Sequence, residues 1–308
     1  MRPTLGQRLR AAPRRLLLAY AAGLGAYLAV MGLTSGNRPE QFLVAGLALA
    51  LAAWSDATRR VLAGLLPFLI FGVVYDLTHL TEPLVRHLHV HVAEPYAFDR
   101  RFFAISTPEG PLTPNEWFAR HHWPVVDFIT GLAYIVYVFW SIGFAAALAI
   151  FAREERTRRV LVRFGWTFLA MNLVGFATYY VYPAAPPWYV ARYGLGPADM
   201  AARSSAAGAA RWDALTGIPW FAGFYGRSAD VFGAIPSLHV AYPLLTWLYG
   251  RELGKRWLDA ASLGLFLVVS FAAVYLDHHY VLDVLLGVAY AVAAWGLEKA
   301  LERRRAAR

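Results

Sequence analysis

Eight long apolar runs limit what this chain can fold into more than any other feature of its sequence. A helix that spans a bilayer needs about 20 mostly apolar residues, because the hydrocarbon core is about 30 Å thick. The runs lie near 16–33, 41–54, 61–80, 124–151, 160–182, 236–250, 257–276 and 279–299. The second and sixth runs are shorter than a bilayer span requires, so we expect them to be tilted, partly re-entrant or extended by their flanks. With 58% hydrophobic residues, the chain is predicted to be an all-α, polytopic membrane helical bundle of about eight transmembrane helices.

The charged residues predict the topology of this bundle. The net charge of +9 does not indicate nucleic-acid binding, because the basic residues cluster between the apolar runs and form no soluble basic domain. If the N-terminus is cytoplasmic, most of the 29 Lys and Arg residues fall in short cytoplasmic loops or tails, as the positive-inside rule requires. Both termini are then cytoplasmic, and segments 81–123 and 183–235 are extracytoplasmic. A cleaved signal peptide is the competing interpretation of the first run, but more spans follow it and no clear cleavage site does.

The composition also limits the chemistry. The chain has no cysteine, which excludes thiol catalysis, disulfides and thiolate metal sites. His87, His89 and His91 alternate in segment 81–123, a spacing that suits a strand or loop, and no carboxylate stands at a recognised ligand interval. We therefore expect no metal site there and interpret the segment as an amphipathic interfacial stretch. No nucleotide-binding fingerprint is present, and no cofactor is expected.

Two short motifs predict a functional site. Phe232-Gly-Ala-Ile-Pro-Ser-Leu-His239 opens the sixth run, and Asp277-His-His-Tyr-Val-Leu-Asp283 opens the eighth. Pro236 suits the first position of a helix, which would leave the next backbone N–H groups free to bind an anion. The predicted topology places both motifs on the extracytoplasmic face.

The second motif pairs an imidazole with a carboxylate. His279 and Asp283 are four residues apart, so on a helix they share one face, and the carboxylate can orient the imidazole as a nucleophile or base. Ionisable residues within membranes default to function, although His239, His279 and Asp283 could instead be satisfied packing or capping residues. His278 could face the site or the lipid interface. Asp277 is expected to cap the last helix.

Ser237 stands two residues from His239, which invites a comparison with a Ser-His-Asp triad. Residues two apart at a helix start do not present a hydroxyl to an imidazole well. We therefore favour a serine whose hydroxyl or amide helps to bind an oxyanion.

These residues carry a resemblance to a known family. Pro236-Ser-Leu-His239 and His279-x-x-x-Asp283 resemble two signatures of the type-2 phosphatidic acid phosphatase superfamily. A closer resemblance is to inositol phosphorylceramide synthase, and it covers about 180–290. That resemblance is carried by the two motifs above and by Ala185-Pro-Pro-Trp-Tyr189, Tyr193-Gly-Leu-Gly-Pro-Ala-Asp199 and Arg211-Trp-Asp-Ala-Leu215.

The resemblance implies a double displacement. His279, oriented by Asp283, would attack the phosphorus of a phosphodiester lipid and form a phosphohistidine. His239 would protonate the departing alcohol and then take a proton from the acceptor hydroxyl. This agrees with a nucleophile that has its own orienting carboxylate and a separate acid/base.

The sequence departs from the superfamily at its cationic positions. The signature K-x6-R-P is absent, and Ala273 stands where the S-R signature would have its arginine. Candidates to meet the phosphate are Arg203, Arg211, His278 and the helix-start amides, although the two arginines could equally contact lipid headgroups or solvent. Fewer fixed cations would suit a singly charged phosphodiester better than a dianionic monoester, which favours a transferase over a phosphatase.

The sequence therefore predicts a membrane phosphotransferase of the type-2 phosphatidic acid phosphatase superfamily. Its expected partners are the bilayer, a phosphatidylinositol-like phospholipid donor and a lipid or polyol acceptor, with no nucleic acid. A lipid phosphate phosphatase on the same scaffold and a non-catalytic transport or lipid-binding protein are the alternatives. The expected parts are N-terminal transmembrane helices (1–80), an extracytoplasmic interfacial segment (81–123) and a catalytic transmembrane domain (124–308) with its extracytoplasmic loop (183–235). The Ala- and Arg-rich composition is typical of bacterial proteins, so the expected location is a bacterial plasma membrane.

Overall fold

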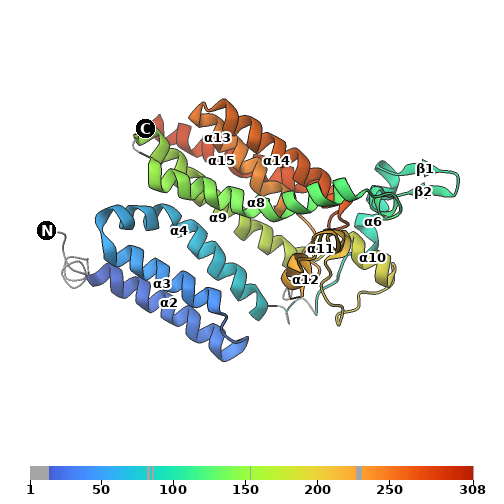
Figure 1. The fold of residues 1–308 in the computed structure, drawn as a ribbon, viewed down its shortest axis with the longest axis horizontal. Helices are drawn as coiled ribbons and strands as arrows, with labels where there is room; N and C mark the ends of the chain where they lie inside the picture. Colours follow the sequence, from blue (N-terminus) through green and yellow to red (C-terminus); the bar gives the residue numbers. More distant parts are fainter. Residues whose placement is uncertain (1–13, 82–83, 85–86, 153, 227–230, 308) are drawn as a thin grey trace. The chain divides into compact units, whose positions relative to one another are not determined.

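The computed structural model describes residues 14–81, 84, 87–152, 154–226 and 231–307. Nearly all regular structure in these residues is helical, apart from one two-stranded hairpin (Figure 1). The chain forms two compact units, one of residues 1–81 and 143–169 and the other of 82–142 and 170–308. The predicted division into three parts is not tested by these units and stays a prediction.

The first unit is built on α2 (Arg14–Thr34), α3 (Pro39–Trp54) and α4 (Asp56–Leu77), followed by the short η1 (Thr78–Leu80). Small residues on α3, among them Ala45 and Ala48, are buried against Leu24 of α2 and Leu62 of α4. Small side chains allow helices to approach closely in a membrane. Ser55 ends α3 and caps α4 by accepting a hydrogen bond from the Thr58 amide.

The long helices α8 (Pro124–Phe151) and α9 (Glu155–Val181) contribute to both units. In the second unit they accompany α13 (Leu238–Gly250), α14 (Arg256–Tyr275) and α15 (Val281–Ala306), of which α13 packs on both α14 and α15. Polar side chains are paired between helices, including Ser141 with Thr246 at 2.9 Å and Thr178 with Tyr290 at 2.7 Å. Such pairing is needed where lipid offers polar groups no water.

Six of the described helices are long and apolar enough to cross a membrane: α2, α4, α8, α9, α14 and α15. The two runs that the sequence marks as short form α3, with 16 residues, and α13, with 13. At about 1.5 Å per residue, these two helices are roughly 24 and 20 Å long, shorter than the hydrocarbon core. The predicted count of about eight is therefore approximate.

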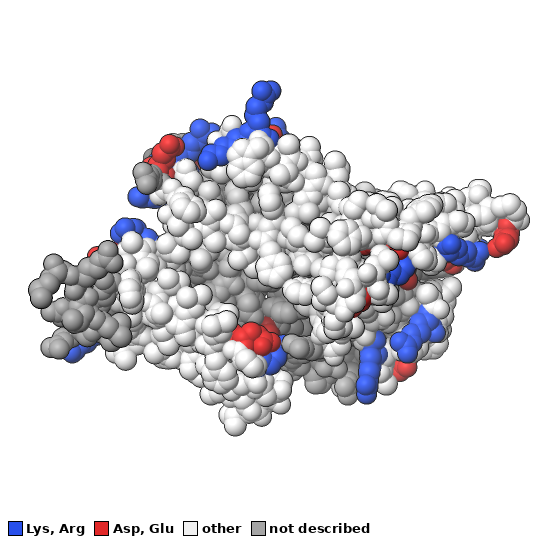
Figure 2. Space-filling view, viewed as in Figure 1, with Lys and Arg blue, Asp and Glu red and all other residues white. Residues whose placement is uncertain are grey.

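The exposed sides of the long helices are apolar, as contact with lipid requires. In the view of Figure 2, Lys and Arg gather at helix ends and on loops, and the surface between them carries few charges. On α8, for example, Phe128, Ile129 and Phe139 are all exposed.

Two segments between the long helices fold into short elements that belong to the second unit. The first contains α6 (Ala93–Phe102), the antiparallel hairpin of β1 (Ile105–Thr107) and β2 (Gly110–Leu112), and α7 (Pro114–Arg120). The second contains α10 (Pro187–Tyr193), η2 (Ala207–Ala209), α11 (Ala210–Thr216) and α12 (Trp220–Tyr225), and a further short turn, η3 (Arg251–Leu253), follows α13. An isolated bridge pairs His91 with Ala184, and another pairs Ala184 with Gly233. The two segments therefore pack on each other, and the interfacial position of the first stays a prediction.

Helices α13 and α15 approach most closely at Gly287. A Cβ atom built on Gly287 would lie 2.3 Å from the backbone oxygen of Ser237, a distance that real structures do not tolerate. Gly296, on the same helix, has no neighbouring atom within 4 Å of such a Cβ. The absence of a side chain at Gly287 therefore allows the two helix starts to meet.

We expect Gly287→Ala to destabilise the protein by about 1–3 kcal/mol, because overpacking against backbone forces a shift of α13 or α15. Gly296→Ala is the matched control and should be neutral or slightly stabilising, since alanine favours helix. Thermal unfolding of the purified protein in detergent measures both. Equal melting temperatures for the two variants would show that the close approach at Gly287 is not needed.

Candidate active site

His279 and Asp283 lie together at the start of α15. Nδ1 of His279 is 3.3 Å from Oδ2 of Asp283, which also accepts a hydrogen bond of 2.9 Å from the Tyr280 amide. Both side chains are buried. The helix begins at Val281 with Tyr280 as its N-cap, so the expectation that His279 and Asp283 share a helical face is wrong in one respect. His279 precedes the helix, and the carboxylate reaches back to it from the first turn.

His239 meets His279 from the start of α13. Its Nδ1 lies 2.9 Å from Nε2 of His279, and the two ring centroids are 5.0 Å apart in an edge-to-face arrangement. His239 is only partly buried. Asp283 and His239 therefore contact opposite nitrogens of the His279 ring.

The helix-start prediction for Pro236 needs correction. Ser237 is the N-cap of α13 and Leu238 its first residue, so Pro236 lies outside the helix. The Ser237 amide is not free but donates to the backbone oxygen of Asp283 at 3.0 Å. The backbone thus joins the two motifs directly.

Aromatic rings from α8 and α12 surround the imidazoles. The Tyr134 ring stacks on His239 with centroids 4.5 Å apart and on His278 at 5.4 Å. Tyr225 stacks on the other side of His278 at 4.5 Å. His278 is thus buried beside the site and does not face the lipid interface, which resolves the alternative that the sequence left open.

Burial, reinforced by the nearby His279, lowers the pKa of His278 to about 3. His278 is therefore a neutral imidazole at physiological pH and cannot serve as a cation for phosphate. Its Nε2 is buried without a hydrogen-bond partner among the described residues, as are the hydroxyls of Ser237 and Tyr134. Unpartnered buried polar atoms are costly, so these three atoms are candidates to contact a ligand. Because the Ser237 hydroxyl hydrogen-bonds to neither histidine, Ser237 forms no Ser-His-Asp triad with these described residues.

Arg211 is engaged in a structural ion pair. Its Nε lies 2.7 Å from Oδ1 of Asp127, a buried carboxylate in the first turn of α8, and its Nη2 donates to the Tyr275 backbone oxygen at 3.2 Å. The Tyr275 hydroxyl donates to the same Asp127 oxygen at 2.9 Å. Arg211 therefore ties α11 to α8 and α14, whereas Arg203 is exposed on the loop before η2. Sequence reasoning missed Asp127, although a carboxylate inside an apolar run was a usable signal.

Asp277 does not cap α15. It adopts a left-handed conformation (φ 64°) three residues before the N-cap, and burial raises its pKa to about 7. The cap comes from Asp99 of α6, whose carboxylate oxygens accept hydrogen bonds from the Val281 amide at 2.8 Å and the Leu282 amide at 3.1 Å. Asn115 of α7 is also buried here and donates to the backbone oxygens of Val274 and His279. No sequence signal marked Asp99 or Asn115.

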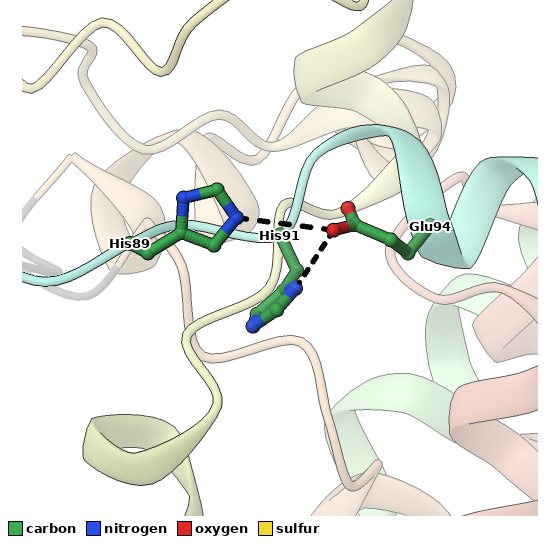
Figure 3. Close-up of side chains that lie close together, drawn as sticks. All are labelled: His89, His91 and Glu94. Atoms are coloured by element: carbon green, nitrogen blue, oxygen red, sulfur yellow. Dashed lines mark hydrogen bonds and ion pairs between the residues drawn. The ribbon is translucent and has the colours of Figure 1, made fainter.

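His89, His91 and Glu94 form a separate cluster on segment 81–123 (Figure 3). Oε1 of Glu94 is 3.0 Å from Nδ1 of His91 and 3.8 Å from Nε2 of His89. The sequence shows no carboxylate at a recognised ligand interval, but the first turn of α6 brings Glu94 beside these histidines. The three groups have the ligand types that a divalent cation uses. His89 is 78% exposed. Neither His239 nor His279 belongs to this cluster.

Comparison with known proteins identifies the family to which the chain belongs. A family model described as the PAP2 superfamily matches residues 110–297, a span that contains both motifs. The chain belongs to this superfamily of membrane phosphatases and phosphotransferases.

Two similar proteins have names that describe a particular reaction. The chain is 38% identical over 262 residues to a phosphoinositol dihydroceramide synthase from Bacteroides thetaiotaomicron, which covers 84% of each chain. It is 38% identical over 126 residues to the inositol phosphorylceramide synthase catalytic subunit aur1 of Schizosaccharomyces pombe, which covers 41% of this chain and 30% of that one. The resemblance to inositol phosphorylceramide synthases is thereby confirmed. No solved structure matches the chain.

We expect Arg211→Ala to destabilise the protein by about 3 kcal/mol, because it leaves the buried Asp127 carboxylate without its charged partner. Arg203→Ala should change the free energy of unfolding by less than about 0.5 kcal/mol, as is usual for an exposed side chain. Thermal unfolding in detergent compares the two. A melting temperature for Arg211→Ala that equals that of Arg203→Ala would contradict a structural role.

Proposed function

We propose that this multi-pass membrane protein transfers a phosphoinositol headgroup from a phosphatidylinositol-like phospholipid to the hydroxyl of a ceramide-like long-chain lipid. The observation that carries the proposal is the short contact between His239 and His279, with Asp283 behind the second imidazole. The site supplies the parts of a two-step phosphoryl transfer, and the Bacteroides relative is named for transfer of phosphoinositol to dihydroceramide. This relationship favours a transferase over a phosphatase or a non-catalytic protein.

In the first step, Nε2 of His279 attacks phosphorus and the bond to the diacylglycerol oxygen breaks. The Asp283 carboxylate holds the proton on Nδ1 of His279 and stabilises the cation that forms. His239 enters this step as an imidazolium, and its Nδ1, which faces Nε2 of His279, donates a proton to the departing oxygen and leaves a neutral imidazole. The products are diacylglycerol and a phosphoinositol group bound covalently to His279.

In the second step, His239 takes the proton from the acceptor hydroxyl while that oxygen attacks phosphorus. The bond from phosphorus to His279 breaks, and both histidines return to their starting protonation states. The phosphorus must lie between the two imidazoles, so substrate binding separates atoms that are now 2.9 Å apart.

The charges around the site support a phosphodiester substrate. Arg211 is paired with Asp127, and His278 is neutral because burial lowers its pKa to about 3. The Ser237 hydroxyl, the Tyr134 hydroxyl and the His278 imidazole are instead neutral groups for the phosphate oxygens or the polyol. A singly charged phosphodiester needs less compensation than a dianionic monoester, in which desolvation of two charges would be opposed by few cations.

The proposal also includes the orientation of the protein in the membrane. We place the active site on the extracytoplasmic side of a bacterial plasma membrane and both termini in the cytoplasm, as the distribution of Lys and Arg favours. Arg203, exposed on the extracytoplasmic loop, is then placed to attract the anionic donor lipid.

We expect His279→Ala to lower phosphoinositol transfer on the order of a thousandfold or more, because the nucleophile is lost. Labelled phosphatidylinositol and ceramide, with lipid products separated by mass spectrometry, measure the transfer. His87→Ala, an exposed histidine outside the site, is the control and should retain wild-type activity. Release of inorganic phosphate from phosphatidic acid without any inositol lipid product would contradict the proposal.

The roles of the two histidines can be separated with a nitrophenyl ester of phosphoinositol, whose leaving group needs no proton. His239→Ala should still release a burst of nitrophenol equal to the enzyme concentration and then stall as the acid-labile phosphoenzyme. His279→Ala should give no burst. A burst from His279→Ala, or its absence from His239→Ala and wild type alike, would contradict these assignments.

A further inference from the structure

We infer that Asp99 and Asn115 are positioning residues that set the orientation of His279 and Asp283 for reaction. The inference rests on the proposed function, since it concerns the same nucleophile. It adds two residues from α6 and α7 that touch neither the reacting atoms nor the carboxylate of Asp283.

The first observation is the cap on α15. A helix start leaves its first amides without partners, and no side chain of the N-cap residue Tyr280 takes that role. The fully buried Asp99 does so from 182 residues earlier in the chain, with one carboxylate oxygen for each of the Val281 and Leu282 amides. Asp283 lies one residue beyond Leu282, so the direction of its side chain depends on this cap.

The second observation concerns the backbone of the nucleophile itself. Nδ2 of Asn115 donates to the His279 oxygen at 3.0 Å and to the Val274 oxygen, at the end of α14, at 2.9 Å. On the inner side of the turn, the His278 and His279 amides donate to the Ala273 oxygen. The turn from α14 to α15 is therefore held from both sides, and Asn115 fixes the peptide that follows the reactive imidazole.

The third observation is that the two residues belong to one braced unit. Thr113 caps α7, and its amide donates to Glu116, whose other carboxylate oxygen accepts from the Tyr96 hydroxyl of α6 at 3.0 Å. The hairpin β1–β2 connects the two helices. Asp99 lies outside the matched span of the superfamily, which starts at residue 110. The brace thus extends beyond the residues that the family model covers.

The helix dipole explains why a carboxylate serves here. Negative charge is favoured at a helix N-terminus, and both hydrogen bonds are charge-assisted. An asparagine of the same shape would accept only one of the two amides and would turn its own N–H groups toward the other. Loss of the second bond would release the first turn of α15 and lengthen the contact between His279 and Asp283.

Asp99→Asn tests the inference with little change in shape. We expect kcat for phosphoinositol transfer to fall 10- to 100-fold, as is typical when a supporting hydrogen bond to a reactive group is lost, while KM changes by less than about threefold. Glu94→Gln, on the exposed first turn of the same α6, is the matched control and should keep the wild-type kcat. A kcat for Asp99→Asn within twofold of wild type would overturn the inference.

Asn115 provides a second series in case Asp99→Asn does not fold. Asn115→Ala removes the donor to the His279 oxygen and should lower kcat about 10-fold, and Asn115→Asp should lower it further because a carboxylate would face two carbonyl oxygens. If the two variants keep the wild-type kcat per folded molecule, the residues are merely structural and the inference is wrong.

A spectroscopic readout separates this inference from the proposed function. The 15N signals of His279, assigned by their loss in His279→Ala, report which ring nitrogen carries the proton. We expect Asp99→Asn to shift these signals, and Glu94→Gln to leave them unchanged, whatever substrate the protein uses. Absence of phosphoinositol transfer in the wild type would contradict the proposed function alone, whereas unchanged His279 signals in Asp99→Asn would contradict the positioning role alone.

Discussion

The backbone hydrogen bond from the Ser237 amide to the Asp283 oxygen is the contact on which the site depends. It joins two helix starts and satisfies a backbone amide that α13 cannot itself pair. The bond requires a close approach, and Gly287 allows it because any side chain there would strike the Ser237 carbonyl. Once the two starts meet, His239 and His279 are brought to hydrogen-bonding distance.

Among the described residues, some buried polar groups are paired and others, at the site and elsewhere, are not. Between the helices, Ser141 and Thr246 satisfy each other. Beside the two imidazoles, the Ser237 hydroxyl and Nε2 of His278 are buried without partners among the residues that the structure describes. Burial of unpartnered groups costs free energy, and a substrate that hydrogen-bonds to them recovers it. The same burial lowers the pKa of His278, so this imidazole offers a ligand a hydrogen bond more readily than a charge.

Segments 81–123 and 183–235 have a larger share in the site than their composition indicates. In segment 81–123, α6 caps α15 and α7 holds the turn that carries His279. Arg211 in the second segment anchors α11 to α8 and α14 through Asp127. Such braces matter for catalysis, since a displacement of about 1 Å at a reacting group costs roughly 100-fold in rate.

The sequence by itself determined the helical membrane architecture, the two short runs and the histidine motifs. Hydrophobic length and short-range motifs are local properties that survive in any arrangement of the helices. It did not predict that Asp99 would cap α15 in place of Asp277, that Pro236 would stand outside α13, or that Arg211 would be held by Asp127. The Arg211–Asp127 pair and the Asp99 cap join groups 84 and 182 residues apart that meet only when the helices pack. Only the tertiary structure decided them, because buried polar groups take whichever partner the packing brings within reach, and sequence spacing does not record that choice.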